Sequence, residues 1–338
     1  MYKYTDPIIQ LEYLQDNTPP SFAYKEGEDI ELWKVRARKK LEELTGLDKF
    51  KKVADDQFMI ENIEERDDYI RYRFNLLVEE KSTSVGYLLL PHNMPSIPMV
   101  ICLQGHSNGM HISIGKAKVP EEIETIKGGR DLAIQAINQG FAALVIEQRD
   151  FGERKRHPEE LGVDCHVPTM YELMLGRTTI ASRVWDISRT LDAILRNFKQ
   201  IDSDKIYITG NSGGGTVSYY TACLEDRIAA SMPSCSVCTY RGSIATIWHC
   251  VCNHIPSILQ YFEMADLALL IAPKPIVIIC GKDDINFPLE SVKEAFLRIK
   301  ELYRYAGAED RCTLVIGNEG HRFYPEEGWA AFNKLTKE

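Results

Sequence analysis

The sequence predicts an α/β fold in which a mostly parallel central sheet is flanked by helices. After Pro98, short apolar runs recur at residues 99–103, 142–147, 205–209, 228–232, 275–280 and 312–316. Longer helical or loop segments separate these runs, and continuous apolar strands spaced in this way are typical of a parallel sheet covered on both faces. A glycine-rich turn at residues 210–214 directly follows one of the runs.

Two of the intervening segments carry apolar stripes at helical spacing. The stripes consist of Val184, Ile187, Leu191, Ile194 and Leu195, and of Val292, Ala295, Phe296 and Ile299. Apolar residues that recur every three or four positions predict a helix with one buried face. The sequence contains no internal repeat, low-complexity tract or flexible linker, so we expect one main domain.

The chain before Pro98 has a different pattern. Residues 57–63, 69–78 and 84–90 have strand-like character and are joined by short polar turns, which favours antiparallel hairpins. Ahead of them, Asp29 is a candidate N-cap for a helix with apolar residues at Ile30, Trp33, Ala37, Leu41 and Leu44. We therefore divide the chain into an N-terminal helical extension, residues 1–55, and a main domain, residues 56–338. The extension is expected to act as a lid or a packing arm.

Composition and charge exclude several classes of partner. The chain has 338 residues, 44% of them hydrophobic, and a formal net charge of −9. An acidic protein is a poor match for a nucleic acid, whose phosphates need a basic surface. No segment approaches the roughly 20 consecutive apolar residues that span a membrane, and the first seven residues lack the apolar core of a signal peptide. We expect a cytoplasmic protein with no nucleic-acid or membrane partner. The sequence does not determine the oligomeric state, and a homo-oligomer is one possibility.

Residues 210–214 form the strongest local motif, Gly-Asn-Ser-Gly-Gly, a G-x-S-x-G pattern between a strand and a helical segment at 216–224. In that context the serine sits on a sharp, strained turn with an exposed hydroxyl, and glycine is favoured on both sides because side chains would collide with the strand and helix. We therefore predict Ser212 as a nucleophile. The alternative is a glycine-rich turn with an incidental serine.

A serine nucleophile needs a base and a third group that orients the base. The run 276–280 is followed by Asp283 and Asp284, and the run 312–316 is followed by His321. Since open α/β sheets build their sites at the carboxyl ends of strands, these groups are expected to meet Ser212. We predict His321 as the general base and Asp284 as the acid, with Asp283 as the alternative acid. The alternatives without a catalytic role are that His321 is a surface loop histidine and that the aspartates are solvated loop carboxylates.

An acyl-transfer site also needs two backbone N–H donors for the oxyanion. Gly213 follows the nucleophile and is predicted to supply one donor. The loop after the run 99–103 reads Gln-Gly-His, and we assign the second donor to the N–H group of His106. Gln104, Arg149 and Asp150 lie just beyond predicted strand ends and are candidates for the substrate pocket. The predicted chemistry needs no metal and no organic cofactor.

Several motifs together resemble one branch of a known superfamily. They are the runs 104–106, 147–154, 183–186 and 210–215, Asp284, and the pair 320–321. From about residue 80 to 335 the chain resembles the acetyl xylan esterase-like and dienelactone hydrolase-like branch of the α/β-hydrolases. The Arg-Asp-Phe-Gly-Glu and Arg-Val-Trp-Asp segments are more particular to this branch than the three catalytic positions.

This resemblance implies the α/β-hydrolase fold and hydrolysis of carboxylic esters, often small acyl (acetyl) esters of a carbohydrate or a similar small molecule. Two departures bear on the pocket, because Gln104 stands where the branch usually has histidine and Asp150 where it usually has glycine. A dienelactone-type lactone hydrolase and a serine peptidase are the alternative activities. A catalytically inactive binding protein on the same fold is the alternative without activity.

Nine cysteines, an odd number, do not indicate a disulfide framework. The Cys-x-x-Cys pair at 235 and 238 and the Cys-x-Cys pair at 250 and 252 suggest a zinc site, although the second spacing is unusual for one. We expect these four thiols to lie on a loop near the site as reduced packing or pocket-lining groups. The sequence leaves open whether Cys235, Cys238, Cys250 and Cys252 have a further role.

Overall fold

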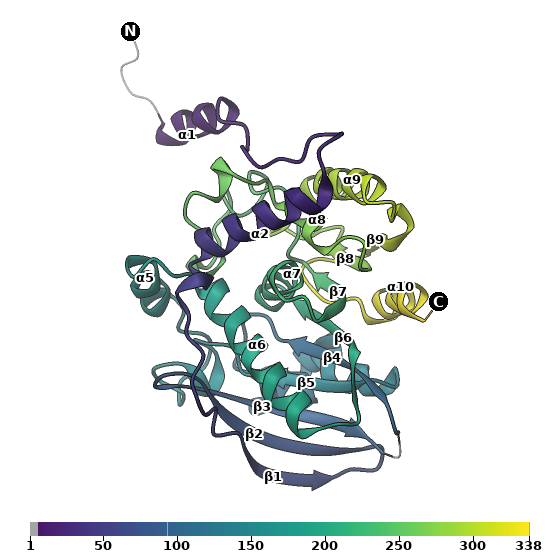
Figure 1. Ribbon diagram of the computed structural model, residues 1–338. Coiled ribbons are helices and arrows are strands. Elements are labelled where there is room, and N and C mark those ends of the chain that lie inside the picture. The colour runs from purple at the N-terminus through teal and green to yellow at the C-terminus, as the bar shows by residue number, and fades with distance from the viewer. Residues whose placement is uncertain (1–5, 93, 338) are drawn as a thin grey trace.

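The computed structural model describes residues 6–92 and 94–337, and a nine-stranded sheet forms its centre. The strand order is β1-β2-β3-β5-β4-β6-β7-β8-β9. The pairs β1–β2, β2–β3 and β3–β5 are antiparallel, and all other neighbouring pairs are parallel. Helices flank the sheet (Figure 1). The predicted α/β fold with a mostly parallel central sheet is therefore confirmed.

Every predicted strand segment forms a strand, with ends that shift by a few residues. The strands are β1 (Met59–Glu65), β2 (Tyr69–Glu79), β3 (Ser82–Pro91), β4 (Ile97–Leu103), β5 (Ala142–Ile146), β6 (Ile201–Asn211), β7 (Ile228–Ser234), β8 (Ile276–Gly281) and β9 (Cys312–Gly317). The start of β6 differs most from the prediction, because Ile201 already pairs with Ile97 of β4 across a polar stretch that hides the strand in the sequence.

Most of the helices pack on one or the other face of the sheet. The helices are α1 (Pro7–Asp16), α2 (Ile30–Thr45), α3 (Glu121–Thr125), α4 (Leu132–Asn138), α5 (His166–Met174), α6 (Thr179–Asn197), α7 (Gly213–Leu224), α8 (Ala268–Ile271), α9 (Leu289–Tyr305) and α10 (Pro325–Thr336). Among the described residues, no helix combines the length and the apolar character that crossing a membrane requires.

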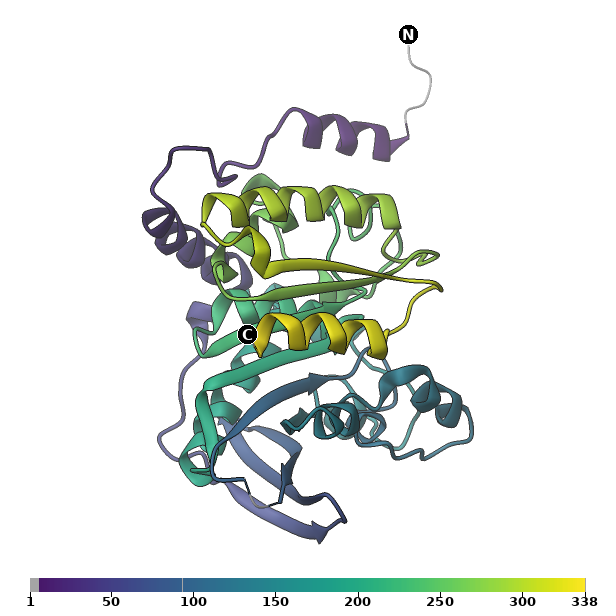
Figure 2. The ribbon, with the colours of Figure 1, turned by 90° about the vertical axis from the view of Figure 1, so that its right-hand side faces the viewer.

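Two apolar cores lie on opposite faces of the sheet. Successive residues of a strand point to opposite faces, so Ile278 joins one core and Val277 the other. The larger core also contains apolar residues of α2, α6, α7, α8 and α9. The smaller core contains residues of α4 and α10, and Figure 2 shows α10 lying across this face. The parallel strands are thus buried on both sides, as their continuous apolar runs require.

The N-terminal segment contains two helices in different environments. Asp29 caps α2 as predicted, since its side chain accepts a hydrogen bond from the N–H group of Leu32 at 2.9 Å. Trp33 and Leu41 of α2 are buried in the larger core, so this helix is a packing arm. In contrast, α1 has no buried residue and lies at the periphery in both views (Figures 1 and 2). Residues 1–5 of the predicted extension lie outside the described residues.

The central position of β6 yields a stability prediction. Ile208 is 0% exposed in β6, whereas Ile63 of the edge strand β1 is 57% exposed. We expect Ile208→Ala to lower the free energy of unfolding by about 2–5 kcal/mol. The matched control Ile63→Ala should change it by no more than about 0.5 kcal/mol. Urea denaturation of the two variants tests this, and equal losses would contradict the described packing.

Candidate active site

Ser212 lies in the turn between β6 and α7, in a conformation that residues other than glycine rarely adopt. Its φ is 56° and its ψ is −123°. The Ser212 N–H group donates to the carbonyl of Ser234 at 2.8 Å, and the Ser212 carbonyl accepts from the Thr216 N–H group at 2.8 Å. These hydrogen bonds fix a strained backbone, and such strain is concentrated at functional sites.

The glycines around Ser212 are required by close backbone contacts. A Cβ atom on Gly210 would lie 2.4 Å from the carbonyl oxygen of Gly214. One on Gly214 would lie 2.2 Å from the carbonyl oxygen of Leu103, at the end of β4. A turn that packs this tightly between a strand and a helix matches the nucleophile turn that the G-x-S-x-G pattern predicts.

His321 and Asp284 meet at the carboxyl ends of β9 and β8. Nδ1 of His321 lies 2.8 Å from Oδ2 of Asp284. The Asp284 side chain is fully buried, and its other oxygen accepts from the N–H groups of Asn286 and Phe287 at 2.9 and 3.1 Å. Burial acts to raise the pKa of Asp284, but the His321 hydrogen bond and charge and these N–H groups outweigh it and lower the pKa. The geometry therefore provides an ionised acid bonded to the imidazole.

The two candidate acids have different surroundings. The Asp283 side chain is 67% exposed and has Lys282 as its charged neighbour at 3.9 Å. Of these two carboxylates, Asp284 is the one within hydrogen-bond distance of the His321 ring. The structure thus places Asp284, rather than the alternative Asp283, in the position of a group that orients the imidazole.

Several contacts position the loop that carries His321. Its ring stacks on Phe287 with centroids 5.9 Å apart, and its carbonyl accepts from Nη2 of Arg130 at 3.0 Å. The hydroxyl of Tyr324 donates to the carbonyl of Gly320 at 2.8 Å. These contacts come from both sides of the loop and limit the orientations that the imidazole can take.

Strand β7, between β6 and β8, links the nucleophile turn to His321. Ser234 at its end accepts from the Ser212 N–H group. The next residue, Cys235, has its sulfur within 4.8 Å of the ligating atoms of Asp284 and His321. The turn that carries Ser212 and the pair of Asp284 and His321 therefore both adjoin the end of this strand.

The two predicted oxyanion donors also lie side by side. A Cβ atom on Gly105 would lie 3.1 Å from Cβ of Ser212, and one on Gly213 would lie 2.8 Å from Nδ1 of His106. Within the described parts of the chain, the N–H groups of Gly213 and His106 donate to no protein acceptor. Both are available to a negative oxygen next to Ser212.

A cavity of about 560 Å³ opens beside this site. Its wall includes His106 from the oxyanion loop and Arg322, which follows His321. Arg130 and Glu122 also line it, and most of the other lining residues are polar or charged. The volume is in the range of about 300–1,000 Å³ that small-molecule sites occupy. No pattern in the sequence identified Arg130, because it belongs to an irregular helical turn that is distant in the sequence from Ser212, Asp284 and His321.

Glu122 and Asn108 give this cavity a fixed wall. Glu122 accepts from the side chain of Asn108 at 2.7 Å and lies 2.9 Å from Nε2 of His111. Burial acts to raise the pKa of Glu122, but hydrogen bonds from the Lys118 N–H group, Asn108 and His111 outweigh it and lower the pKa to about 2. The wall therefore carries a permanent negative charge that is already hydrogen-bonded.

The structure places Gln104 beneath the site and outside the cavity wall. It is 3% exposed, its side-chain amide nitrogen donates to Glu147 at 2.7 Å, and its backbone carbonyl accepts from the side chain of Gln148 at 2.6 Å. Glu147 also accepts from the N–H group of Met110 at 3.0 Å. Burial raises the pKa of Glu147 to about 7, although the hydrogen bonds from the N–H groups of Met110 and Glu153 act to lower it. Gln104 therefore supports the oxyanion loop, and no contact with a substrate is indicated.

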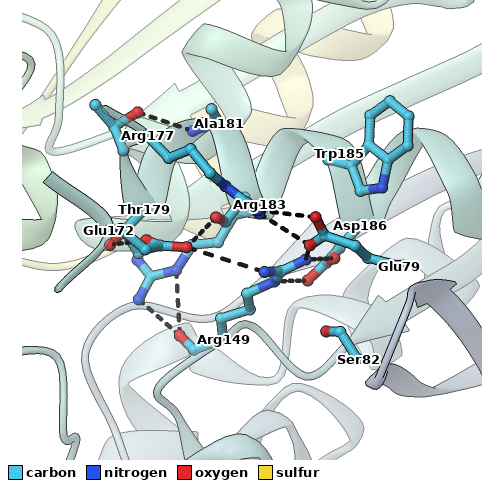
Figure 3. Close-up of polar contacts among 12 residues, drawn as sticks. Glu79, Ser82, Arg149, Glu172, Arg177, Thr179, Ala181, Arg183, Trp185 and Asp186 are labelled. Atoms are coloured by element: carbon cyan, nitrogen blue, oxygen red, sulfur yellow. Dashed lines mark hydrogen bonds and ion pairs between the residues drawn. The ribbon is translucent and has the colours of Figure 1, made fainter. Parts of the chain in front are cut away.

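Arg149 also lies outside the cavity wall, because acidic groups surround it. Its guanidinium donates to Asp186 of α6 at 3.0 and 2.8 Å and lies 3.4 Å from Glu79 (Figure 3). Arg154 donates to the same Asp186 at 2.5 Å. Burial acts to raise the pKa of Asp186, but the two arginine charges lower it. The Arg-Asp-Phe-Gly-Glu and Arg-Val-Trp-Asp segments therefore bind each other and fix the loop after β5.

Asp150, the third pocket candidate, is buried within that loop. It is 7% exposed, its φ is 71°, and Arg183 lies 3.9 Å away. Burial raises the pKa of Asp150 to about 7, although the charge of Arg183 acts in the opposite direction. The sequence located these polar residues at strand ends correctly, but it could not show that ion pairs inside the protein engage them.

The cysteine pairs separate in the structure. Cys235 lies against Asp284 and His321, whereas Cys250 and Cys252 lie with Cys165 and the ring of His106. Cys165 was missed by the sequence analysis, because it is isolated in the sequence and belongs to no short cysteine motif. All nine cysteines are free thiols.

A known protein family matches most of this chain. An abhydrolase family model matches residues 8–308, a range that contains Ser212 and Asp284 but ends before His321. A Bacillus subtilis (strain 168) protein provisionally named as a hydrolase, YtaP, is 26% identical over 263 residues, which is 77% of this chain and 85% of that protein.

Solved structures share the fold at low sequence identity. A Bacteroides fragilis NCTC 9343 protein provisionally named as an acetyl xylan esterase aligns with a TM-score of 0.75 at 18% identity, over 93% of this chain and 83% of its own. A glucuronoyl esterase from Solibacter usitatus aligns with a TM-score of 0.66 at 15% identity, over 94% and 96% of the two chains. A structure named methylesterase BT1017 aligns with a TM-score of 0.71 at 20% identity, over 97% and 67%.

The predicted resemblance to the α/β-hydrolases is confirmed by the family match together with the sheet and its flanking helices. The chain belongs to the abhydrolase family and is a hydrolase built on the α/β-hydrolase fold.

Proposed function

We propose that this protein is a serine hydrolase that cleaves carboxylic esters through an acyl-enzyme intermediate. Ser212 is the nucleophile, His321 the general base and Asp284 the acid that orients the base. The observation that carries the proposal is the hydrogen bond between His321 and the fully buried Asp284, next to a strained serine turn. The alternative of an inactive binding protein gives no reason for the chain to keep both a strained backbone at Ser212 and a buried, ionised Asp284.

The proposed first step is attack of the Ser212 hydroxyl on the ester carbonyl. His321 takes the hydroxyl proton as the new C–O bond forms, and Asp284 holds Nδ1 so that Nε2 is free to accept that proton. The same imidazole then donates the proton to the departing alcohol. In the second half, His321 takes a proton from water, the hydroxide attacks the acyl group, and Ser212 is released with its proton restored.

The oxyanion of each tetrahedral intermediate is proposed to bind to the N–H groups of Gly213 and His106. Neither donor has a protein acceptor among the described residues, so neither must break a hydrogen bond before it binds the oxygen. Donors that are already aimed at the developing charge stabilise the transition state without reorganisation, by about 2.7–4 kcal/mol each in comparable sites.

The substrate is proposed to be a small acyl ester, such as an acetyl ester, of a carbohydrate or a similarly polar small molecule. The cavity next to the catalytic residues has a wall rich in polar and charged groups, among them Asn108, Glu122 and Arg130. Such a wall suits hydroxyl-rich molecules better than long acyl chains. The structural neighbours include proteins named as acetyl xylan esterase and glucuronoyl esterase, which adds support by analogy.

A second candidate places the sugar on the acyl side of the ester. Arg130 and Arg322 both line the cavity. Arg130 donates to the backbone carbonyl of His321, and Arg322 is the residue that follows His321. Two guanidinium groups close to the carbonyl would favour an acyl part with many oxygen atoms, such as a uronic acid. Lactone and peptide hydrolysis remain alternatives that the same catalytic groups would support.

The catalytic assignment predicts a specific pattern of losses. Ser212→Ala and His321→Ala should each lower kcat for an activated acetyl ester by about 10⁶-fold, and Asp284→Asn by about 10⁴-fold. The matched control Asp283→Asn should keep kcat within about twofold, because this carboxylate is exposed and does not contact His321. Labelling by a fluorophosphonate should disappear in Ser212→Ala, and labelling that persists there would rule out Ser212 as the nucleophile.

The cavity predicts which esters react fastest. A series of nitrophenyl acetate, butyrate and octanoate should show kcat/KM for octanoate at least about tenfold below that for acetate, because charged side chains, among them Glu122 and Arg130, line the cavity that would have to hold a long chain. An acetylated xylose oligomer and a methyl glucuronate should then be compared. Rapid turnover of octanoate alone would contradict the small, polar substrate.

The variant Arg322→Ala distinguishes the two substrate hypotheses, an acetyl ester of a carbohydrate and an ester of a uronic acid. It should lower kcat/KM for methyl glucuronate by about 10- to 100-fold if the uronic acid is the acyl part, with little effect on acetylated xylose. An unchanged ratio of the two values would count against the second candidate.

A further inference from the structure

Four potential metal ligands meet behind the oxyanion loop, and the proposed ester hydrolysis uses none of these four side chains. They are the imidazole of His106 and the thiols of Cys165, Cys250 and Cys252, whose ligating atoms all lie within 4.8 Å of one another. They come from three separate segments: the loop after β4, the residue before α5, and the short helical turn at Val251–Asn253 with its preceding residue. Side chains so far apart in the sequence do not cluster through local geometry.

The spacing of the four atoms fits a tetrahedral metal ion. Zinc binds sulfur at about 2.3 Å and nitrogen at about 2.0–2.1 Å, so its ligand atoms stand roughly 3.5–3.8 Å apart. Nε2 of His106 lies 3.2 Å from the sulfur of Cys252, and all four atoms fall within the 4.8 Å limit. These separations are compatible with four ligands of one ion.

Arg183 supplies the charge that such a site needs. It is 2% exposed, and its guanidinium lies 3.6 Å from the sulfur of Cys165 and 3.7 Å from that of Cys252. A divalent ion bound by three thiolates and one neutral imidazole carries a net charge of −1. A guanidinium has only donors, and it is always charged, so a buried arginine directed at two sulfurs favours their anionic form.

The surroundings are those of an enclosed site. Cys165 and Cys252 are 3% and 2% exposed and form a small apolar cluster with Phe151. The ring of Phe151 lies 5.0 Å from that of His106 and 4.4 Å from the guanidinium carbon of Arg183. Cys250 is half-buried, which gives an ion a path to the cluster.

We propose that His106, Cys165, Cys250 and Cys252 form a structural Zn²⁺ site. Each thiol loses its proton to solvent as its sulfur binds the ion, and Nε2 of His106 binds as the neutral imidazole. Four protein ligands leave no open position, so the ion holds the fold together and takes no part in the hydrolysis. This site replaces the sequence-based expectation of no metal. It also differs from the cysteine quartet that the sequence suggested, since Cys235 and Cys238 are not members.

The site would position the oxyanion loop. Nδ1 of His106 faces Gly213, where a Cβ atom would approach it to 2.8 Å. An ion on Nε2 therefore ties the loop that carries one proposed oxyanion donor to α5 and to the loop before Val251. His106 is in this sense a positioning residue through its ring.

The direct test is the metal content of the full-length protein, purified with a reductant and without a histidine tag. We expect elemental mass spectrometry to find about one zinc ion per chain. The metal-free protein reconstituted with Co²⁺ should show the intense visible bands of a tetrahedral ion and a near-ultraviolet thiolate-to-cobalt transition. Chelation of the ion should lower Tm.

Matched variants locate the site. Cys165→Ser and Cys250→Ser should each lower bound zinc at least tenfold, whereas Cys312→Ser should retain it, because Cys312 lies on β9 outside the cluster. Circular dichroism establishes that each variant is folded. Ser212→Ala should keep its zinc while losing hydrolysis, so a failure of the metal site and a failure of the ester hydrolase are distinguishable.

Three outcomes would overturn the proposal. The first is a reduced, folded wild-type protein that contains no zinc and takes up neither Zn²⁺ nor Co²⁺ at micromolar concentration. The second is bound Co²⁺ with the weak spectrum of an octahedral ion and no thiolate transition. The third is an equal loss of zinc in Cys312→Ser and Cys165→Ser. The wild-type cobalt spectrum keeps the test decisive even where a variant does not fold.

Discussion

The site depends on how closely the turn after β6 approaches the end of β4. The carbonyl oxygen of Leu103 occupies the space that a side chain on Gly214 would need, and the backbone of Gly214 does the same to Gly210. Because β4 and β6 are neighbouring parallel strands, the loops that follow them are forced against each other. The proposed nucleophile and both proposed oxyanion donors are consequences of this one contact. The other two proposed catalytic groups, Asp284 and His321, follow the ends of β8 and β9 further along the sheet.

A second layer of charged residues holds the loops around that contact. Asp186 of α6 binds Arg149 and Arg154 and so fixes the loop after β5, which carries Phe151 beneath the ring of His106. Removal of one partner from a buried ion pair leaves an uncompensated charge and is strongly destabilising. The segments that are particular to this branch of the superfamily thus act by supporting the oxyanion loop, and the pocket wall is built from other residues.

The sequence was most informative where one local rule decides the structure. Apolar runs predicted the six strands β4 to β9. The G-x-S-x-G pattern and the chain order of its partners predicted which side chains follow the ends of these strands. It was least informative where long-range contacts decide. Gln104, Arg149 and Asp150 read as pocket residues because polar groups follow strands, yet Glu147, Asp186 and Arg183 bind or surround them. Cys165 shows the same limit, since only the folded chain brings it to Cys250 and Cys252.

The glycine-rich start of α7 constrains how this enzyme could adapt to heat. A glycine inside a helix lowers stability by about 1 kcal/mol relative to alanine, so replacing it by alanine usually stabilises a protein. Here Gly213, Gly214 and Gly215 each face an atom that a methyl group would strike. The helix instead gains its stability further along, from the fully buried rings of Tyr219 and Tyr220. Substitutions that adapt this chain to heat must therefore lie outside the start of α7, because its glycines cannot be replaced by alanine without a steric clash.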